Sequence, residues 1–578
     1  MDPHAIAEDW LQRFSVSVFS GDVDATVQTF LPNGWLRDSL VFTWDSRSLE
    51  GHTKITAYLE NTLAKANLAG FRLDERPWLR PERVLENDAG ISAGFAFESP
   101  KTTGRGYAYL LQESDDRGQW KALSVFMMLE NIKGHEERGP EAGVYGGHTL
   151  SWEEVNAERR ARIERNPHVL VVGAGQTGLQ IAARFKQMDI PTLVIERNAA
   201  IGDQWRKRYP TLSLNTTKNH HTFLYQAYPT NWPEFTPRDK LANWLAQYAV
   251  SQDLVVWTSS SIMAHPRPTY ESVSKTWTVV IDRDGAPVEI HPIHIVIAVG
   301  TLGAPRIPAV LGIEYFGGTI MNGDQYKGGQ PFTGKRALVV GAGSTAADIC
   351  QDLHVHGAEA VTMVQRSSSC VVAQKTIAED YYRAFPDGVP LEVSDFKFFA
   401  MPINLQRAFA KAKEAEMWDK EKELHEKLRK GGVKLNMGRD GSGIQLLIFE
   451  RFGGGWIDVG VADLIGSGKV KVKQGVEIAR FQERQVIFTD ESSEDVDLVI
   501  FATGYLDPRE DLKQIFGEEI IGSTGPLWGL DDEGEIRGCY RPTGHPGLWY
   551  GAGEFTTVRF LSKQLALQIK AIELGILS

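Results

Sequence analysis

HVLVVGAGQTGLQIAARF (168–185) and RALVVGAGSTAADICQDL (336–353) are the two stretches that decide the fold. Each begins with an apolar run typical of a strand buried on both faces of a parallel sheet. Each then passes through a glycine-rich turn into a helix, with Gly173, Gly175 and Gly178 in the first copy and Gly341, Gly343, Ser344 and Ala346 in the second. Glycine in such a turn lets the backbone approach a pyrophosphate. The sequence therefore predicts two dinucleotide-binding folds.

The two folds differ at the end of their next strand. PTLVIERN (191–198) ends in Glu196 and Arg197, and a carboxylate there accepts hydrogen bonds from ribose hydroxyls and repels a 2'-phosphate. This favours FAD or NAD. AVTMVQRSS (360–368) ends instead in Arg366 and Ser367. Because a guanidinium pairs well with a 2'-phosphate, the second fold favours NADPH.

Composition narrows the class of protein. The chain has 578 residues, of which 42% are hydrophobic and 24% charged, and its net charge is -12. That charge argues against nucleic acid or an anionic membrane as partner. No apolar stretch approaches the ~20 residues that span a bilayer, and MDPHAIAEDW lacks the features of a signal peptide, so a cytoplasmic location is expected. Cys350, Cys370 and Cys539 lie far apart, which predicts no metal site and argues against a disulfide reductase.

Residues 1–135 form a separate unit in this interpretation. Helical patterns at 5–19 and 52–65 precede alternating segments within 91–131, which predict antiparallel strands with one face buried. The arrangement resembles the NTF2-like fold, an α+β cone with a pocket. Asp38 and Asp45 are interpreted as exposed turn carboxylates. The unit is assigned to packing, to homodimerisation or to shaping the substrate entrance. Residues 136–166 are a linker and a charged helix, with Ser151 as N-cap and Glu154 completing a capping box.

Three further segments carry a family resemblance: IGDQWRKRYPTLSLNTTKNHHTF (201–223), IVIAVGTLGAPRIP (295–308) and DLVIFATGY (497–505). Together with the two turns, they resemble the flavin-containing monooxygenases and their Baeyer-Villiger relatives over roughly residues 165–578. The resemblance implies an α/β fold in which an FAD domain (167–304 and 495–578) is interrupted by an NADPH domain (305–494). A long charged helix at about 403–430 is expected within the latter.

The resemblance also implies site residues. Gln204 and Trp205 match a segment that lies along the flavin, and Thr503 and Gly504 match its FAD contacts. Asn215 matches an amide beside the flavin, although a turn residue explains it equally well. The family fingerprint FxGxxxH finds Phe316 and Gly318, but Asn322 stands in place of histidine. Asn215 and Asn322 are the catalytic candidates that the resemblance implies. The asparagine at 322, combined with the N-terminal extension, resembles the type II branch of the family, whose members are less strict about NADH versus NADPH.

The activity implied is that of a monooxygenase. NADPH reduces FAD, the reduced ring adds O2 at its C4a carbon, and the peroxide oxygenates a small organic substrate. That substrate is a ketone, by Baeyer-Villiger insertion, or an amine or sulfide. Two alternatives stay open: an uncoupled NAD(P)H oxidase that releases hydrogen peroxide, and a redox-silent flavoprotein scaffold with a ligand-binding N-terminal unit. Arg559, in the closing helix, either faces the site or forms a structural salt bridge.

Overall fold

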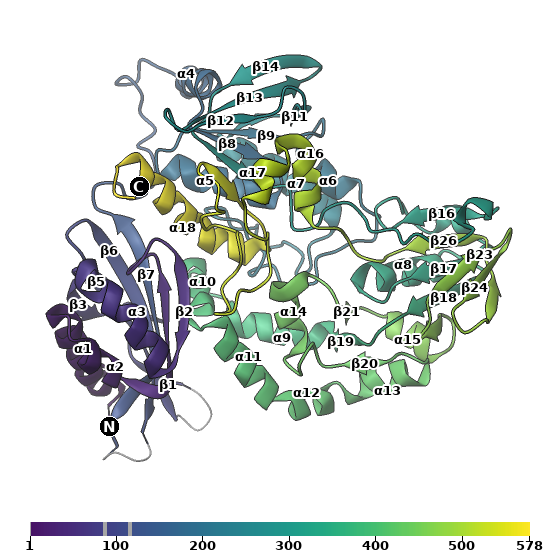
Figure 1. Cartoon of the computed structure of the whole chain (residues 1–578), viewed down its shortest axis with the longest axis horizontal. Coiled ribbons are helices and arrows are strands. Elements are labelled where there is room, and N and C mark those ends of the chain that lie inside the picture. The colour runs from purple at the N-terminus through teal and green to yellow at the C-terminus, as the bar shows by residue number, and fades with distance from the viewer. Residues whose placement is uncertain (1, 85–88, 114–117, 578) are drawn as a thin grey trace.

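The computed structural model describes residues 2–84, 89–113 and 118–577. Its elements form three units, which Figure 1 shows side by side. An N-terminal sheet with its helices lies at the lower left. The first nucleotide fold lies above it, and the second lies at the right, with a row of helices along the bottom. None of the helices in these described ranges is long and apolar enough to cross a membrane.

The N-terminal sheet is mixed and runs in the order β2-β1-β7-β6-β5-β3, with β4 paired to β5. β1 lies parallel to β7 and the other pairs are antiparallel. The strands are β1 (Phe30–Ser39), β2 (Ser46–Glu50), β3 (Ala69–Leu73), β4 (Glu82–Val84), β5 (Gly90–Glu98), β6 (Thr102–Gln112) and β7 (Trp120–Ile132). The helices are α1 (Pro3–Ser20), α2 (Val23–Gln28) and α3 (Gly51–Ala66), which confirms the two helices expected from the sequence.

Both faces of this sheet are buried, whereas the sequence pattern predicted one. Side chains alternate along a strand, so Val125 and Met127 of β7 pack with α1 and α3, while Phe126 and Met128 point the other way. The second face packs on two helices of the nucleotide-binding units. The Phe126 ring lies 5.6 Å from Phe396. The unit is therefore fixed to the rest of the chain by a shared apolar core.

The first nucleotide fold follows α4 (Trp152–Arg165), whose predicted capping box is present. Its parallel sheet runs β10-β9-β8-β15-β27. The strands are β8 (Val169–Val172), β9 (Thr192–Ile195), β10 (Val255–Trp257), β15 (His294–Ile297) and β27 (Leu548–Tyr550). A small antiparallel sheet holds β11 (Ser260–Ile262), β12 (Thr269–Glu271), β13 (Thr276–Arg283) and β14 (Ala286–Ile290). The helices are α5 (Gln176–Gln187), α6 (Asp203–Arg206), α7 (Arg238–Ser251), α16 (Pro508–Phe516), α17 (Glu518–Gly522) and α18 (Phe555–Glu573).

The second fold has a parallel sheet in the order β16-β26-β17-β18-β22. These strands are β16 (Thr319–Asn322), β17 (Arg336–Val340), β18 (Ala360–Gln365), β22 (Lys471–Gln474) and β26 (Leu498–Phe501). Two three-stranded sheets complete it: β19 (Ser369–Ala373) with β20 (Leu435–Asn436) and β21 (Gly455–Asp458), and β23 (Ile478–Phe481) with β24 (Gln485–Phe488) and β25 (Ser493–Asp495). Its helices include α8 (Ser344–Val355), α9 (Gln374–Ala384), α10 (Leu391–Ala400), α14 (Gly443–Arg451) and α15 (Val461–Gly466).

The charged stretch at 403–430 is not one long helix. It is divided into α11 (Ile403–Ala412), α12 (Glu414–Lys420) and α13 (Lys422–Lys430). The two ends belong to different cores, which explains the bends. Leu405 packs against Trp35 of the N-terminal sheet, while Leu428 lies in the core of the second nucleotide fold.

The chain passes between the two nucleotide folds along two paired segments. Leu506 donates its amide hydrogen to Ala304 O at 2.9 Å, and Arg306 donates to Gly504 O at 2.8 Å. We call residues 303–306 and 503–506 the crossing ribbon. The expected return to the first fold at 495 lies too early, because β26 still belongs to the second sheet.

Candidate functional site

The first glycine turn is shaped by close packing at two of its three glycines. Gly173 has φ +108°, and a Cβ there would lie 2.6 Å from Ala298 O. A Cβ on Gly178 would lie 1.9 Å from Gly173 O. Gly175 is different, because an added Cβ would meet only Gln204 Nε2, at 3.5 Å. Space in front of the α5 N-terminus is thus open, and its amide groups have no side-chain cap.

Next to this opening, α6 carries two residues with buried polar atoms that lack partners within the described ranges, and one of those atoms, Gln204 Nε2, borders Gly175. In the part of the chain that the structure describes, neither amide atom of Gln204 has a hydrogen-bond partner, and Trp205 Nε1 has none. Burying such groups unpaired costs free energy, so they mark a place for a polar ligand. Because Gln204 Nε2 borders Gly175, these residues fit a dinucleotide in the first turn.

Glu196 lies at the end of β9, beside the same turn. Its side chain is buried and accepts hydrogen bonds from the amides of Ala174 at 3.0 Å and Asn198 at 2.9 Å. The carboxylate is therefore fixed against the turn, where a ribose would lie. Arg197, the next residue, is exposed.

The second turn repeats this geometry. Gly341 has φ +132°, and a Cβ there would lie 2.3 Å from Ala502 O, whereas at Gly343 the nearest atom would be 4.0 Å away. Ala346 is buried beneath the turn, and Ser344 and Ser367 are exposed. The second turn therefore also leaves room for a dinucleotide at the start of α8.

Arg366 lies at the rim of the second turn. Its side chain is 77% exposed and pairs with Glu477, with Nη1 3.1 Å from Oε1. The guanidinium is thus accessible to a 2'-phosphate, and Glu477 is an internal competitor for it.

The two nucleotide folds contact each other close to these turns. Tyr209, just after α6, donates a hydrogen bond to Asp348 Oδ2 on α8 at 2.5 Å. Burial raises the pKa of Asp348 to about 6. From the second fold, Lys327 donates to Asp324 O at 2.6 Å and also to Lys207 O. The contacts bring the carboxyl ends of the two parallel sheets toward one another, which is where ligands bind in such folds.

Asn322 has a structural use that the sequence did not reveal. Its side-chain oxygen accepts the amide hydrogens of Asp324 and Gln325, each at 3.0 Å, and so closes the turn after β16. Thr503 and Gly504 lie in the crossing ribbon, where Thr503 Oγ1 donates to Arg306 O. Asn322 ends β16, and Thr503 and Gly504 come just after β26, which pairs with β17, the strand that leads into the second turn.

Asn215 is partly buried in a loop, residues 213–223, that we call the amide loop. Leu214 donates to Thr236 O at 2.9 Å, and the His221 ring bridges the hydroxyls of Thr216 and Thr236 at 3.1 and 2.7 Å. Burial lowers the pKa of His221 to about 3, so the ring is neutral. It holds the two threonine hydroxyls at a fixed separation through its two nitrogens.

The far end of the amide loop is held by α18. Burial opposes ionisation of Glu554, the N-cap of α18, but His220 lowers its pKa across a distance of 2.7 Å. Arg559, one turn further on, is 3% exposed and forms a bidentate pair with Asp395 of α10 at 2.6 and 2.9 Å. Of the two roles that the sequence left open for Arg559, the structure shows the salt bridge.

A model of the family described as flavin-binding monooxygenase-like matches residues 166–508, which span both turns, the amide loop and the crossing ribbon. The chain belongs to this family. It is an FAD-dependent monooxygenase that uses NADPH, as the two open turns and the resemblance seen in the sequence both indicate. Similarity extends to indole-3-pyruvate monooxygenase YUCCA1 of Oryza sativa subsp. japonica, which is 26% identical over 403 residues, 69% of this chain and 88% of the relative.

Solved structures support the fold of this flavin-binding monooxygenase-like chain. An open crystal structure of cyclohexanone monooxygenase aligns with a TM-score of 0.51 at 16% identity, covering 71% of this chain and 88% of that one. Oxidised steroid monooxygenase bound to NADP aligns with a TM-score of 0.50 at 17% identity, covering 71% and 84%. The mixed α/β architecture with Rossmann-like sheets is therefore that of the class B flavin monooxygenases.

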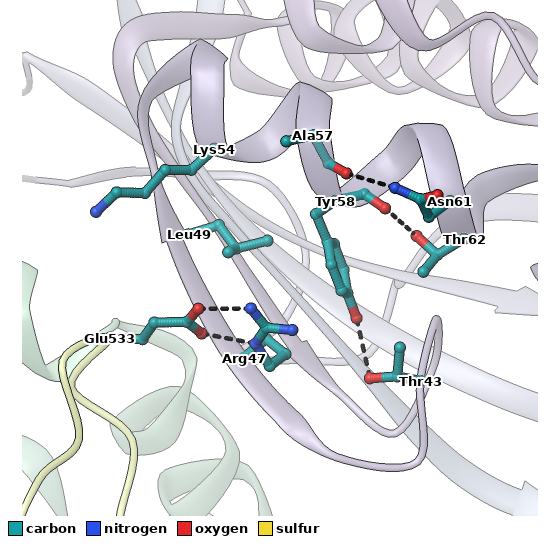
Figure 2. Close-up of a pocket in the computed structure, with 9 residues that line it drawn as sticks. All are labelled: Thr43, Arg47, Leu49, Lys54, Ala57, Tyr58, Asn61, Thr62 and Glu533. Atoms are coloured by element: carbon teal, nitrogen blue, oxygen red, sulfur yellow. Dashed lines mark hydrogen bonds and ion pairs between the residues drawn. The ribbon is translucent and has the colours of Figure 1, made fainter.

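A separate depression of about 460 Å³ lies on the N-terminal unit of this monooxygenase. Figure 2 shows its walls: α3, β2 and a single residue from the C-terminal part, Glu533, which pairs with Arg47. The hydroxyls of Tyr58 and Thr43 lie 3.1 Å apart at its edge. Because none of its lining residues belongs to a glycine turn, this depression is distinct from the nucleotide sites.

Beneath it, Asp38 corrects the interpretation as an exposed carboxylate. Asp38 is completely buried and accepts hydrogen bonds from Tyr58 at 2.7 Å and from the amides of the turn that follows β1. Asp45, in the same turn, is partly exposed but forms a bidentate pair with Arg541. The turn is therefore a docking element rather than a free loop.

Asp38 should make stability depend on pH. Burial raises its pKa to about 7, against about 4 in an unfolded chain. Between these values the folded state binds more protons, so the free energy of unfolding should fall as pH rises from about 4 to about 7. Asp38→Asn cannot ionise and should remove this part of the slope. Urea denaturation of both proteins across that range measures it, and equal slopes would contradict the prediction.

Sequence reasoning missed the contacts that hold the site together. Tyr209 with Asp348, His220 with Glu554, and Asp395 with Arg559 join residues 139 to 334 positions apart. No local pattern marks such pairs. The available signal was a charged residue within an apolar helical pattern, as for Arg559 in α18.

Proposed function

We propose that this monooxygenase oxygenates a small carbonyl compound, a ketone or a 2-oxo acid, in the space between its two glycine turns. The single observation that carries this proposal is the pair of open turns, Gly175 and Gly343, on folds that contact each other at the same edge. The relative named for indole-3-pyruvate, a 2-oxo acid, supports the substrate class.

The proposed roles follow the chemistry of each side chain. Glu196 accepts hydrogen bonds from the ribose of FAD, and the orphaned amide of Gln204 and indole of Trp205 donate toward the same cofactor. Arg366, with Ser367 beside it, holds the 2'-phosphate of NADPH. When bound, the cofactor pair supplies the electrons and the activation of O2.

Asn215 supplies an amide that can both donate and accept a hydrogen bond beside the reacting carbonyl. Its partly buried position limits the access of water, which would otherwise divert the oxygenation to hydrogen peroxide. Asn322 is proposed to maintain the turn beside the reductant rather than to touch the substrate, because its side-chain oxygen is already shared by two amides.

The remaining assignments belong to the same proposal. We assign 167–304 with the C-terminal return to FAD, the segment between the crossings to NADPH, and the N-terminal unit to the NTF2-like class. The helices α1, α2 and α3, packed on one face of its sheet, support that class. A homodimer through this unit is supported by Val16 and Phe19, which expose 62% and 74% of their surface on α1. A cytoplasmic setting is supported by three buried, unpaired cysteines.

The test is a panel of ketones, 2-oxo acids, amines and sulfides, assayed by product mass together with peroxide formed per NADPH consumed. Ketones should gain one oxygen atom, 2-oxo acids should take up one oxygen atom and release carbon dioxide to leave the shorter acid, and both should suppress peroxide. Oxygen transfer to amines or sulfides alone would contradict the substrate class. Peroxide equal to NADPH with every compound would instead establish the oxidase, which the neutral amide of Asn322 in place of histidine favours.

A further inference from the structure

Arg37, on β1 of the N-terminal unit, is buried where that unit meets the nucleotide-binding units. Its side chain is 6% exposed. Nε and Nη2 form a bidentate pair with Glu535, each at 2.8 Å. The remaining nitrogen, Nη1, donates to Phe399 O and to Met401 O, the latter at 3.4 Å. Arg37 therefore caps the carbonyls at the C-terminal end of α10, where a cation is favourable.

The same helix carries Asp395, which links α10 to the amide loop through Arg559. While two nitrogens of Arg559 hold Asp395, Nη1 donates to the carbonyls of His220 and Thr222, each at 2.6 Å. The Asn219 side chain adds a bond to Asp387, at the approach to α10, at 2.9 Å. The position of α10 thus sets the position of the loop that carries Asn215.

A second pair at the same interface makes no such connection. Arg47 pairs with Glu533 at 2.6 and 2.8 Å, as Figure 2 shows, and joins the same two parts of the chain. Its side chain is 35% exposed, and among the described residues its guanidinium hydrogen-bonds to Glu533 alone. Arg37 and Arg47 therefore separate two effects. Both arginines support docking of the N-terminal unit, but of these two only Arg37 also bonds to the end of α10.

We propose that Arg37 is a positioning residue for oxygenation: by fixing the end of α10 it holds Asp395 and Arg559, and through them the amide loop, in place. This inference rests on the proposed role of Asn215. It gives the N-terminal unit a part in the reaction although both glycine turns lie in other parts of the chain.

The test compares two double variants in the full-length, FAD-loaded protein. Arg37→Met with Glu535→Gln removes the cap without leaving a buried charge unpaired, which would itself destabilise the fold. Arg47→Met with Glu533→Gln is the matched control. The Arg37 pair should lower the oxygenation rate by about tenfold, within the about 100-fold that a 1 Å misplacement can cost, and raise peroxide per NADPH accordingly. In the same variant, the rate of anaerobic flavin reduction by NADPH should stay within about twofold of wild type. The Arg47 and Glu533 double variant should resemble wild type in oxygenation rate and in peroxide per NADPH.

Hydrogen exchange of the cofactor-free protein gives a readout that does not depend on turnover. Amides of the amide loop and of the C-terminal end of α10 should exchange faster in the Arg37 pair than in the Arg47 pair. Equal exchange in the two pairs would overturn the inference. If the Arg37 and Glu535 double variant does not bind FAD, Arg37→Lys is tested instead. Lysine keeps a positive charge for Glu535 but lacks the planar guanidinium, whose Nη1 also bonds to the end of α10.

An Asn215→Ala variant distinguishes the two proposals. If this variant still couples NADPH consumption to oxygenation, the proposed role of Asn215 fails, and the exchange data alone decide whether Arg37 fixes the loop. If Asn215→Ala releases hydrogen peroxide in place of product while the Arg37 and Glu535 double variant does not, the inference about Arg37 fails and the proposed function stands.

Discussion

Replacing Gly175 with alanine should give a folded protein that no longer holds FAD. The backbone at Gly175 has φ -80°, which any residue adopts, and an added Cβ meets only the end of the Gln204 side chain, at 3.5 Å. The substitution therefore leaves the fold intact. It places a methyl group where the pyrophosphate must approach the helix N-terminus.

We expect FAD affinity to fall by about 100-fold, or about 3 kcal/mol. Absorbance at the flavin bands after dialysis, with circular dichroism for the fold, measures this. Two controls sharpen it. Gly178→Ala should destabilise the fold itself, because its Cβ would lie 1.9 Å from Gly173 O, whereas Gly343→Ala should stay yellow but resist reduction by NADPH. A yellow Gly175→Ala protein of normal affinity would refute the assignment of the first turn.

Replacing Arg366 with alanine should raise KM for NADPH by about 30-fold, while KM for NADH changes by less than about twofold. A charge-assisted hydrogen bond to a phosphate contributes about 2 kcal/mol, and NADH lacks that phosphate. Steady-state kinetics with both nucleotides measures the difference. Equal effects on the two would show that Arg366 does not hold the 2'-phosphate.

Glu477→Gln is the complementary variant. Because Glu477 pairs with Arg366 at 3.1 Å, removing its charge should free the guanidinium and lower KM for NADPH. The pair is largely exposed, so the gain should be small, about twofold. An increase in KM for both nucleotides would indicate that Glu477 contributes to the cradle itself.

The sequence was most informative where chemistry and local structure coincide. The glycine turns, the capping box at Ser151 and the helices α1 and α3 of the N-terminal unit depend on neighbouring residues, so their spacing can be read from the chain. The division of 403–430 into three helices could not be, since it depends on Leu405 and Leu428 joining different cores.

The residues of the candidate site also differ in whether local sequence or distant contacts determine their positions. Gly175 and Gly343 are specified by their own turns, whereas the position of Asn215 depends on contacts from α18, α10 and β1. Asp38 was misread for a related reason. A carboxylate near a turn is usually exposed, and only the arrangement of Tyr58 and three amides around it shows that it is buried.

The crossing ribbon has a consequence for how this architecture could arise. Its two segments are hydrogen-bonded neighbours, so the ends of the roughly 200-residue excursion lie about one strand spacing apart. Because its two ends are adjacent, a whole domain can be inserted into a loop of the first fold without separating the two sides of that loop. An NADPH-binding domain could thus have been exchanged between ancestral flavoproteins without rearranging the parallel sheet of the fold that received it.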